Sequence, residues 1–141
     1  MMATGDRGKQ RVKTARGRTA ASTRWLERQL NDPYVKKAKA EGYRSRAAYK
    51  LIELDERFGF LKGVRNVVDL GAAPGGWCQV VIKKYPKAKI VAIDLLDMDE
   101  LPNTTFLKMD FLADVAPQAA IDRLGAHANV VLSDMAPNTG G

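Results

Sequence analysis

Four aspartates stand at or beside the ends of short apolar segments along the second half of the chain. The segments NVVDL, IVAID, TFLKMD and NVVLSD carry Asp69, Asp94, Asp110 and Asp134. Runs of Val, Ile and Leu without polar alternation predict strands that are covered on both faces. Because ligands bind beyond the carboxyl ends of parallel strands, we expect the four carboxylates to surround one crevice. Each aspartate alone could also cap the turn that follows its strand.

A glycine-rich stretch, DLGAAPGGW at residues 69–77, leads from the first expected strand into a helix and contains Gly71, Gly75 and Gly76. Such a turn lets a ligand approach the backbone closely. A dinucleotide-binding loop reads G-x-G-x-x-G, and here the middle glycine is missing. A pyrophosphate would also be repelled by the carboxylates, whereas S-adenosylmethionine offers hydroxyls, amines and a sulfonium cation. Charge complementarity therefore favours S-adenosylmethionine over NAD as the cofactor.

The helix that should carry the first candidate cation covers RAAYKLIELDERF, residues 46–58, with Ser45 as its cap and Gly59 as its end. Lys50 lies at the edge of its apolar stripe, from where it could reach solvent or a cleft. At 100° per residue, the side chains expected on the buried face are Ala47, Leu51, Leu54 and Phe58.

The remaining elements complete an α/β pattern. Helices are expected at residues 76–85 and 114–125, between the strands, which predicts a parallel sheet with right-handed crossovers and helices on both faces. Before them, residues 22–30 form a short helical pattern. A second one follows, with Asp32 as cap, Pro33 at the first helical position and Gly42 as stop.

Positive charge is concentrated at the amino-terminal end. Residues 1–50 hold 14 Lys or Arg against 4 Asp or Glu, whereas the other 91 residues hold 9 against 12. This bias favours a nucleic-acid partner, although a solubilising tail is an alternative. We interpret residues 1–21 as a basic, disordered tail and residues 22–141 as one domain. A single cysteine excludes an internal disulfide, no apolar run suggests a membrane span, and a cytoplasmic location is expected. No metal site is expected from the single histidine, His127.

The sequence also resembles a known family. The stretches RSRAAYKL, VVDLGAAPGGW, DLLDMD and SDMAPN are similar to those of the FtsJ-like (RrmJ-like) ribosomal RNA 2′-O-methyltransferases, over residues 22–141. The resemblance implies a Rossmann-like methyltransferase fold with S-adenosylmethionine as cofactor. The substrate it implies is a ribose 2′-hydroxyl, of uridine, in large-subunit ribosomal RNA or the assembled large subunit.

Site residues follow from the resemblance position by position. Gly75 and Trp77 would contact the methionine part of the cofactor, within a glycine loop that also includes Gly71 and Gly76. Asp94 would take the ribose hydroxyls, Asp110 the adenine, and Asp134 would lie near the methyl group. Of the family's Lys-Asp-Lys-Glu catalytic set, Lys50 and Asp134 match the first two, and Lys50 would orient the hydroxyl and stabilise the oxyanion.

The second lysine and the glutamate of that set have no match in this chain, so we expect cofactor binding without catalysis by these residues alone. We also expect the domain to be truncated after its fourth strand. That strand would then form an apolar sheet edge through which the chain could self-associate. Two other functions remain open: a non-catalytic RNA-binding protein of ribosome assembly with the same fold, and an NAD-dependent enzyme.

Overall fold

The structure is a computed structural model, and it describes residues 32–134. The chain divides into two compact units, residues 1–42 and 43–141. In the first unit, α2 (Pro33–Glu41) begins and ends as the sequence predicts. The Asp32 carboxylate accepts a hydrogen bond of 2.7 Å from the Tyr34 N–H, and Gly42 ends the helix with a φ of 85°. The expected tail at residues 1–21 and the helix at 22–30 lie outside the described residues.

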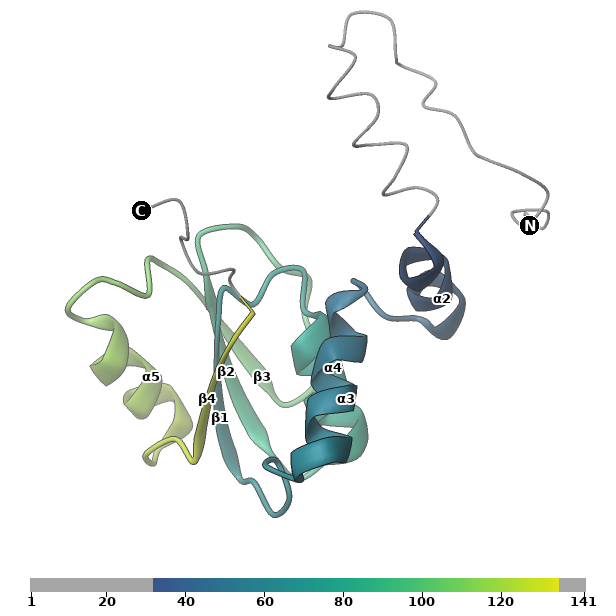
Figure 1. Ribbon diagram of the computed structural model, residues 1–141. Helices are drawn as coiled ribbons and strands as arrows, with labels where there is room; N and C mark the ends of the chain where they lie inside the picture. Colours follow the sequence, from purple (N-terminus) through teal and green to yellow (C-terminus); the bar gives the residue numbers. More distant parts are fainter. Residues whose placement is uncertain (1–31, 135–141) are drawn as a thin grey trace, which may run out of the picture. The chain divides into compact units, whose positions relative to one another are not determined.

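The second unit is a parallel α/β fold, as predicted (Figure 1). Its elements occur within two residues of the expected bounds, and the sheet order is β3-β2-β1-β4 with every pair parallel. In chain order they are α3 (Ala47–Phe58), β1 (Asn66–Leu70), α4 (Gly76–Lys84), β2 (Lys89–Asp94), β3 (Thr104–Lys108), α5 (Ala116–Leu124) and β4 (Val130–Ser133).

Helices cover both faces of the sheet. α3 and α4 lie on one face and α5 on the other (Figure 1). Successive strand residues point to opposite faces. Val67 of β1 therefore belongs to the core beneath α3 and α4, whereas Val68 belongs to the smaller core beneath α5. No described helix has the length and apolar character needed to cross a membrane.

The buried face of α3 differs from the predicted one. Phe58 is 67% exposed, so its expected place in the core is wrong. Leu51 is buried as predicted, but Asp55 is buried beside it, and the Asp55 carboxylate accepts a hydrogen bond of 2.9 Å from the Leu61 N–H. This bond folds the chain back beneath the end of the helix. Leu61, which is fully buried, thus joins the core in place of Phe58.

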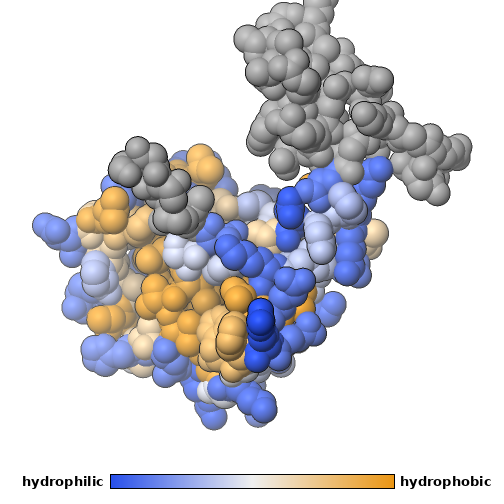
Figure 2. Space-filling view, in the orientation of Figure 1, coloured by the Kyte–Doolittle hydropathy of each residue, from blue (hydrophilic) through white to orange (hydrophobic). Residues whose placement is uncertain are grey.

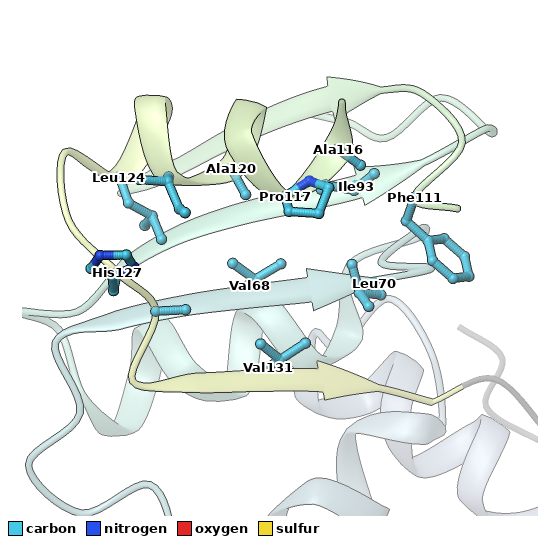
Figure 3. Close-up of a pocket in the computed structure, with 12 residues that line it drawn as sticks. Val68, Leu70, Ile93, Phe111, Ala116, Pro117, Ala120, Leu124, His127 and Val131 are labelled. Carbon is cyan, nitrogen blue, oxygen red and sulfur yellow. The ribbon is translucent and has the colours of Figure 1, made fainter. Parts of the chain in front are cut away.

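β4 forms an edge of the described sheet, as predicted, since its one strand partner there is β1. Between β4 and α5 lies an apolar groove of about 310 Å³, lined by Val68, Leu70 and Val131 among others (Figure 3). Val131 is 60% exposed. Apolar residues gather over this part of the surface in Figure 2.

Candidate active site

The glycine-rich loop after β1 is packed tightly against the chain that precedes α3. Gly75 has a φ of 114°, a conformation that side chains rarely adopt. A Cβ atom on Gly75 would lie 3.0 Å from Nη1 of Arg44, and one on Gly76 would lie 2.7 Å from Oγ of Ser45. These two glycines therefore bring the beginning of α4 close to the beginning of α3. Gly71, with a φ of 69°, starts the same turn.

The N-cap of α3 is Arg46, so the expected cap at Ser45 is wrong, although the Ser45 hydroxyl accepts a hydrogen bond of 3.2 Å from the Ala47 N–H just before the helix. The carbonyl of Ala47 in turn accepts a hydrogen bond of 2.7 Å from the indole Nε1–H of Trp77, on the first turn of α4. Trp77 is buried, with 7% of its surface exposed. The first turns of the two helices are thus fixed to each other by Trp77, the side chain that the family resemblance predicts to contact the cofactor.

Lys50 and Asp134 meet at the carboxyl end of the sheet. Nζ of Lys50, on the first turn of α3, lies 3.4 Å from Oδ1 of Asp134, which directly follows β4. Their side chains are 64% and 32% exposed, so both are open to solvent. The two candidate catalytic residues, which are far apart in sequence, are therefore neighbours in the fold.

Asp69 is a buried carboxylate at the same end of the sheet. It is 2% exposed and its Oδ2 accepts a hydrogen bond of 3.2 Å from the thiol of Cys78. Burial raises its pKa to about 7, and the nearby carboxylates of Asp134 and Asp94 act in the same direction, against the thiol hydrogen bond. Burial also raises the pKa of the Cys78 thiol, and the charge of Asp69 adds to this effect. Cys78 is therefore a protonated donor and no nucleophile.

A small pocket of about 90 Å³ brings several of these groups together. Asp69 and Asp134 line it with the glycine loop and Trp77. The complete lining is Ser45, Ala47, Asp69, Gly71, Ala72, Ala73, Pro74, Gly76, Trp77 and Asp134. The larger groove between α5 and β4 has no carboxylate in its lining. Of these two cavities, the small pocket is the one that contains candidate catalytic and cofactor-binding residues.

Asp94 is the last residue of β2, Asp110 follows β3, and neither lines this pocket. The Asp94 carboxylate accepts hydrogen bonds of 2.9 Å from the N–H groups of Ala73 and Leu96. It thereby joins the glycine loop to the loop after β2. The Asp110 carboxylate accepts a 2.9 Å bond from the Leu112 N–H, within its own turn. Both oxygens of Asp94 already have a protein partner, although each keeps a further lone pair for a ligand.

Arg44 joins the walls of the crevice, and sequence reasoning missed it. Its Nη1 donates to the carbonyls of Pro74 (3.1 Å) and Asp99 (2.8 Å), and its Nη2 to that of Glu100 (3.0 Å). Its backbone N–H donates to Gln79 of α4 at 2.7 Å. One guanidinium thus connects the glycine loop with the loop after β2. The acceptors are backbone carbonyls, and because every residue has one, the sequence does not indicate which of them Arg44 contacts.

The family model for FtsJ-like methyltransferases matches residues 43–141, which include all of this site. The chain belongs to the FtsJ-like methyltransferase family. It is 60% identical, over its whole length, to a ribosomal RNA large subunit methyltransferase E of Rhizorhabdus wittichii, and spans 62% of that protein. A protein of the same name from Novosphingobium aromaticivorans is 65% identical over 94% of this chain, which spans 60% of it.

A solved structure agrees with this assignment. The crystal structure of a ribosomal RNA methyltransferase from Plasmodium falciparum matches 70% of this chain and 60% of its own, with a TM-score of 0.59 and 36% identity. FtsJ-like methyltransferases need a methyl donor. The pocket brings the acidic side chains of Asp69 and Asp134 beside the backbone of the glycine loop, a lining that suits a positively charged group. Among residues 32–134, no cluster of His, Cys, Asp and Glu could hold a metal ion.

Proposed function

We propose that this chain binds S-adenosylmethionine and supplies Lys50 and Asp134 to the methylation of a ribose 2′-hydroxyl, of uridine, in large-subunit ribosomal RNA. The observation that carries the proposal is the 3.4 Å contact between Lys50 and Asp134 beside the glycine-rich loop. The named relatives, which are ribosomal RNA methyltransferases, support the choice of substrate. We place the reaction in the cytoplasm, on free ribosomal RNA or on the large subunit.

Each site residue has a role that its position supports. S-adenosylmethionine, when bound, supplies an electrophilic methyl group. Gly71, Gly75, Gly76 and Trp77 would shape the site for its methionine part, Asp94 would accept its ribose hydroxyls, and Asp110 would contact its adenine. The Lys50 ammonium, held by Asp134, would orient the ribose hydroxyl and stabilise negative charge that develops on its oxygen.

Calorimetry with S-adenosylmethionine and NAD tests the cofactor. We expect S-adenosylmethionine alone to bind. Asp94→Ala should weaken binding by about 1–3 kcal/mol, the range for hydrogen bonds with a charged group. Asp114→Ala, a change of an exposed aspartate after β3, is the control and should leave the affinity unchanged. NAD binding, or full affinity in Asp94→Ala, would contradict the assignment.

Methyl transfer needs a second experiment, because the chain spans about 60% of the length of the curated relatives it matches. We expect residues 1–141 alone to bind cofactor without transferring its labelled methyl group. Fusion to the part of the Rhizorhabdus relative outside the match should give transfer to large subunits. Lys50→Met in this fusion should abolish transfer and keep cofactor binding. A fusion that binds RNA and cofactor but never transfers would favour a non-catalytic assembly protein.

A further inference from the structure

The amino ends of β1 and β2 carry a charged surface that the candidate active site does not use. We propose that this surface, the basic rim, binds an unpaired stretch of RNA. It consists of Phe58, Lys62, Arg65, Lys87 and Lys89. The choice of RNA as the ligand rests on the proposed function. The rim would add a second RNA contact at the amino ends of the strands, whereas Lys50 lies at their carboxyl ends.

Two turns form the basic rim, and the structure joins them firmly. The Asp55 carboxylate accepts hydrogen bonds from the Leu61 N–H and from the hydroxyl of Tyr85 (2.6 Å), and it pairs with Lys84 at 3.0 Å. In addition, the Lys89 N–H donates to the carbonyl of Arg65 at 2.8 Å. The turn after α3 and the turn after α4 therefore form one continuous surface.

The cations of the basic rim have no counter-ion among the residues that the structure describes. Within residues 32–134, the exposed side chains of Lys62, Arg65, Lys87 and Lys89 make no ion pair. Glu56 is the single acid between residues 56 and 65, and residues 83–89 contain four lysines and no acid. Neighbouring unpaired cations repel one another, and a polymer of phosphates relieves this repulsion while it releases counterions.

Exposed aromatic rings lie at the start of the turn that carries Lys62 and Arg65. Phe58 is 67% exposed and Phe60 is 40% exposed, and the guanidinium of Arg57 lies 5.6 Å from the centre of the Phe58 ring. An aromatic ring beside cations is the combination that binds single-stranded nucleic acid, because bases stack on the ring and phosphates meet the charges. A duplex offers the same phosphates but no free base face, so the rim should prefer unpaired RNA.

The basic rim lies at the far end of α3 from the candidate catalytic residue Lys50. Lys50 lies on the first turn of α3 and Phe58 lies at its end, eight residues later, which is a rise of about 12 Å along the helix. RNA held at the rim is therefore anchored away from the reacting hydroxyl. Such an anchor adds affinity without crowding the crevice.

The test uses the 141-residue chain and a fluorescent oligouridylate of about 12 nucleotides, with anisotropy measured at several salt concentrations. The rim variant replaces Lys62, Arg65, Lys87 and Lys89 with Gln. The control variant removes the same charge elsewhere, by Gln at Lys37, Lys39, Lys108 and Arg123. A third variant, Phe58→Ala, keeps every charge.

We expect the rim variant to bind the oligouridylate at least about 10-fold more weakly. The slope of its plot of log K against log salt should be smaller in magnitude by about 2–3. Phe58→Ala should reduce the affinity for the oligouridylate about 5- to 150-fold, because one stacked base is lost. The slope of log K against log salt should stay unchanged, because every phosphate contact remains. A duplex of equal length should show no effect of Phe58→Ala. Equal losses in the rim and control variants, or no loss in the rim variant, would overturn the proposal. Full affinity in Phe58→Ala would overturn the stacking contact.

Calorimetry with S-adenosylmethionine on the same variants separates this proposal from the proposed function. The rim variant should keep the cofactor affinity of the unmodified chain, which also shows that it is folded. Loss of oligouridylate binding with normal cofactor binding supports the rim. A chain that binds oligouridylate through the rim but never binds cofactor would refute the proposed function and leave the rim in place.

Discussion

Nζ of Lys50 and Oδ1 of Asp134 are 3.4 Å apart, and both side chains are open to solvent. An exposed ion pair contributes about 0–1 kcal/mol to stability, so this pair does little to hold the fold. We predict that Lys50→Met changes the free energy of unfolding by less than about 1 kcal/mol, measured by urea denaturation. A larger loss would show that the pair is structural. The same substitution should abolish methyl transfer in the fused protein.

Arg44 should matter for cofactor affinity although it is not expected to touch the cofactor. A lysine in its place has one compact ammonium, which cannot reproduce a fork that reaches three carbonyls. We predict that Arg44→Lys weakens S-adenosylmethionine binding about 10-fold, in the range of a lost charge-assisted hydrogen bond. Arg123→Lys, at the exposed end of α5, is the matched control. Normal affinity in Arg44→Lys would mean that the two loops keep their places without the guanidinium.

The pKa of Asp69 gives a pH dependence with a definite sign. Its pKa is about 7 in the fold, against 3.8 for an ordinary aspartate, because burial and two nearby carboxylates disfavour the charged form. The folded chain thus holds the proton more tightly than the unfolded chain, and this contribution to stability is lost as pH rises from about 4 to 7. The cationic cofactor should favour the charged form of Asp69, so its affinity should rise over the same range.

Asp69→Asn removes this titration and keeps an acceptor for the Cys78 thiol. The free energy of unfolding of the variant, relative to the unmodified chain, should therefore increase by about 2–3 kcal/mol between pH 5 and pH 8. Urea denaturation at both pH values measures it. Asp114→Asn, at an exposed position, should show no such change. If the free energy of unfolding of Asp69→Asn differs from that of the unmodified chain by the same amount at pH 5 and pH 8, the pKa of Asp69 lies outside this pH range.

The groove between α5 and β4 predicts self-association. An exposed apolar edge favours pairing with another chain, and Val131 is an exposed apolar residue of β4 that lines the groove. We predict that light scattering will show species heavier than the 15.5 kDa monomer, and that Val131→Lys will reduce them. Leu112→Lys adds the same charge at an exposed position outside the groove lining and should have no effect. A monomeric unmodified chain would refute the prediction.

The sequence predicted the sheet well because its signals are local. Runs of Val and Ile mark β1 and β2, and Gly59 and Gly125 mark helix ends at which the φ angle is positive. The meeting of Lys50 with Asp134 could be expected once strand order was known, since both lie at the carboxyl edge. These features depend on residue type and on the rules of parallel sheets.

Other features could not be predicted because they depend on contacts between distant segments. Helical periodicity places Phe58 in the core, but a buried carboxylate, Asp55, occupies the stripe and draws Leu61 beneath the helix. In the sequence pattern, Arg44 cannot be distinguished from the nearby Arg46. Its acceptors are backbone carbonyls, and their positions exist only in the folded loops.

The close approach of Gly76 to Ser45 also restricts how this sequence can evolve. A methyl group at position 76 would lie 2.7 Å from the Ser45 hydroxyl and would force it to rotate away from the Ala47 N–H. Loss of that hydrogen bond costs about 1 kcal/mol. Positions 45 and 76 should therefore be epistatic: alanine at 76 becomes less costly after residue 45 has lost its hydroxyl, so the order in which the two substitutions arise decides whether either survives.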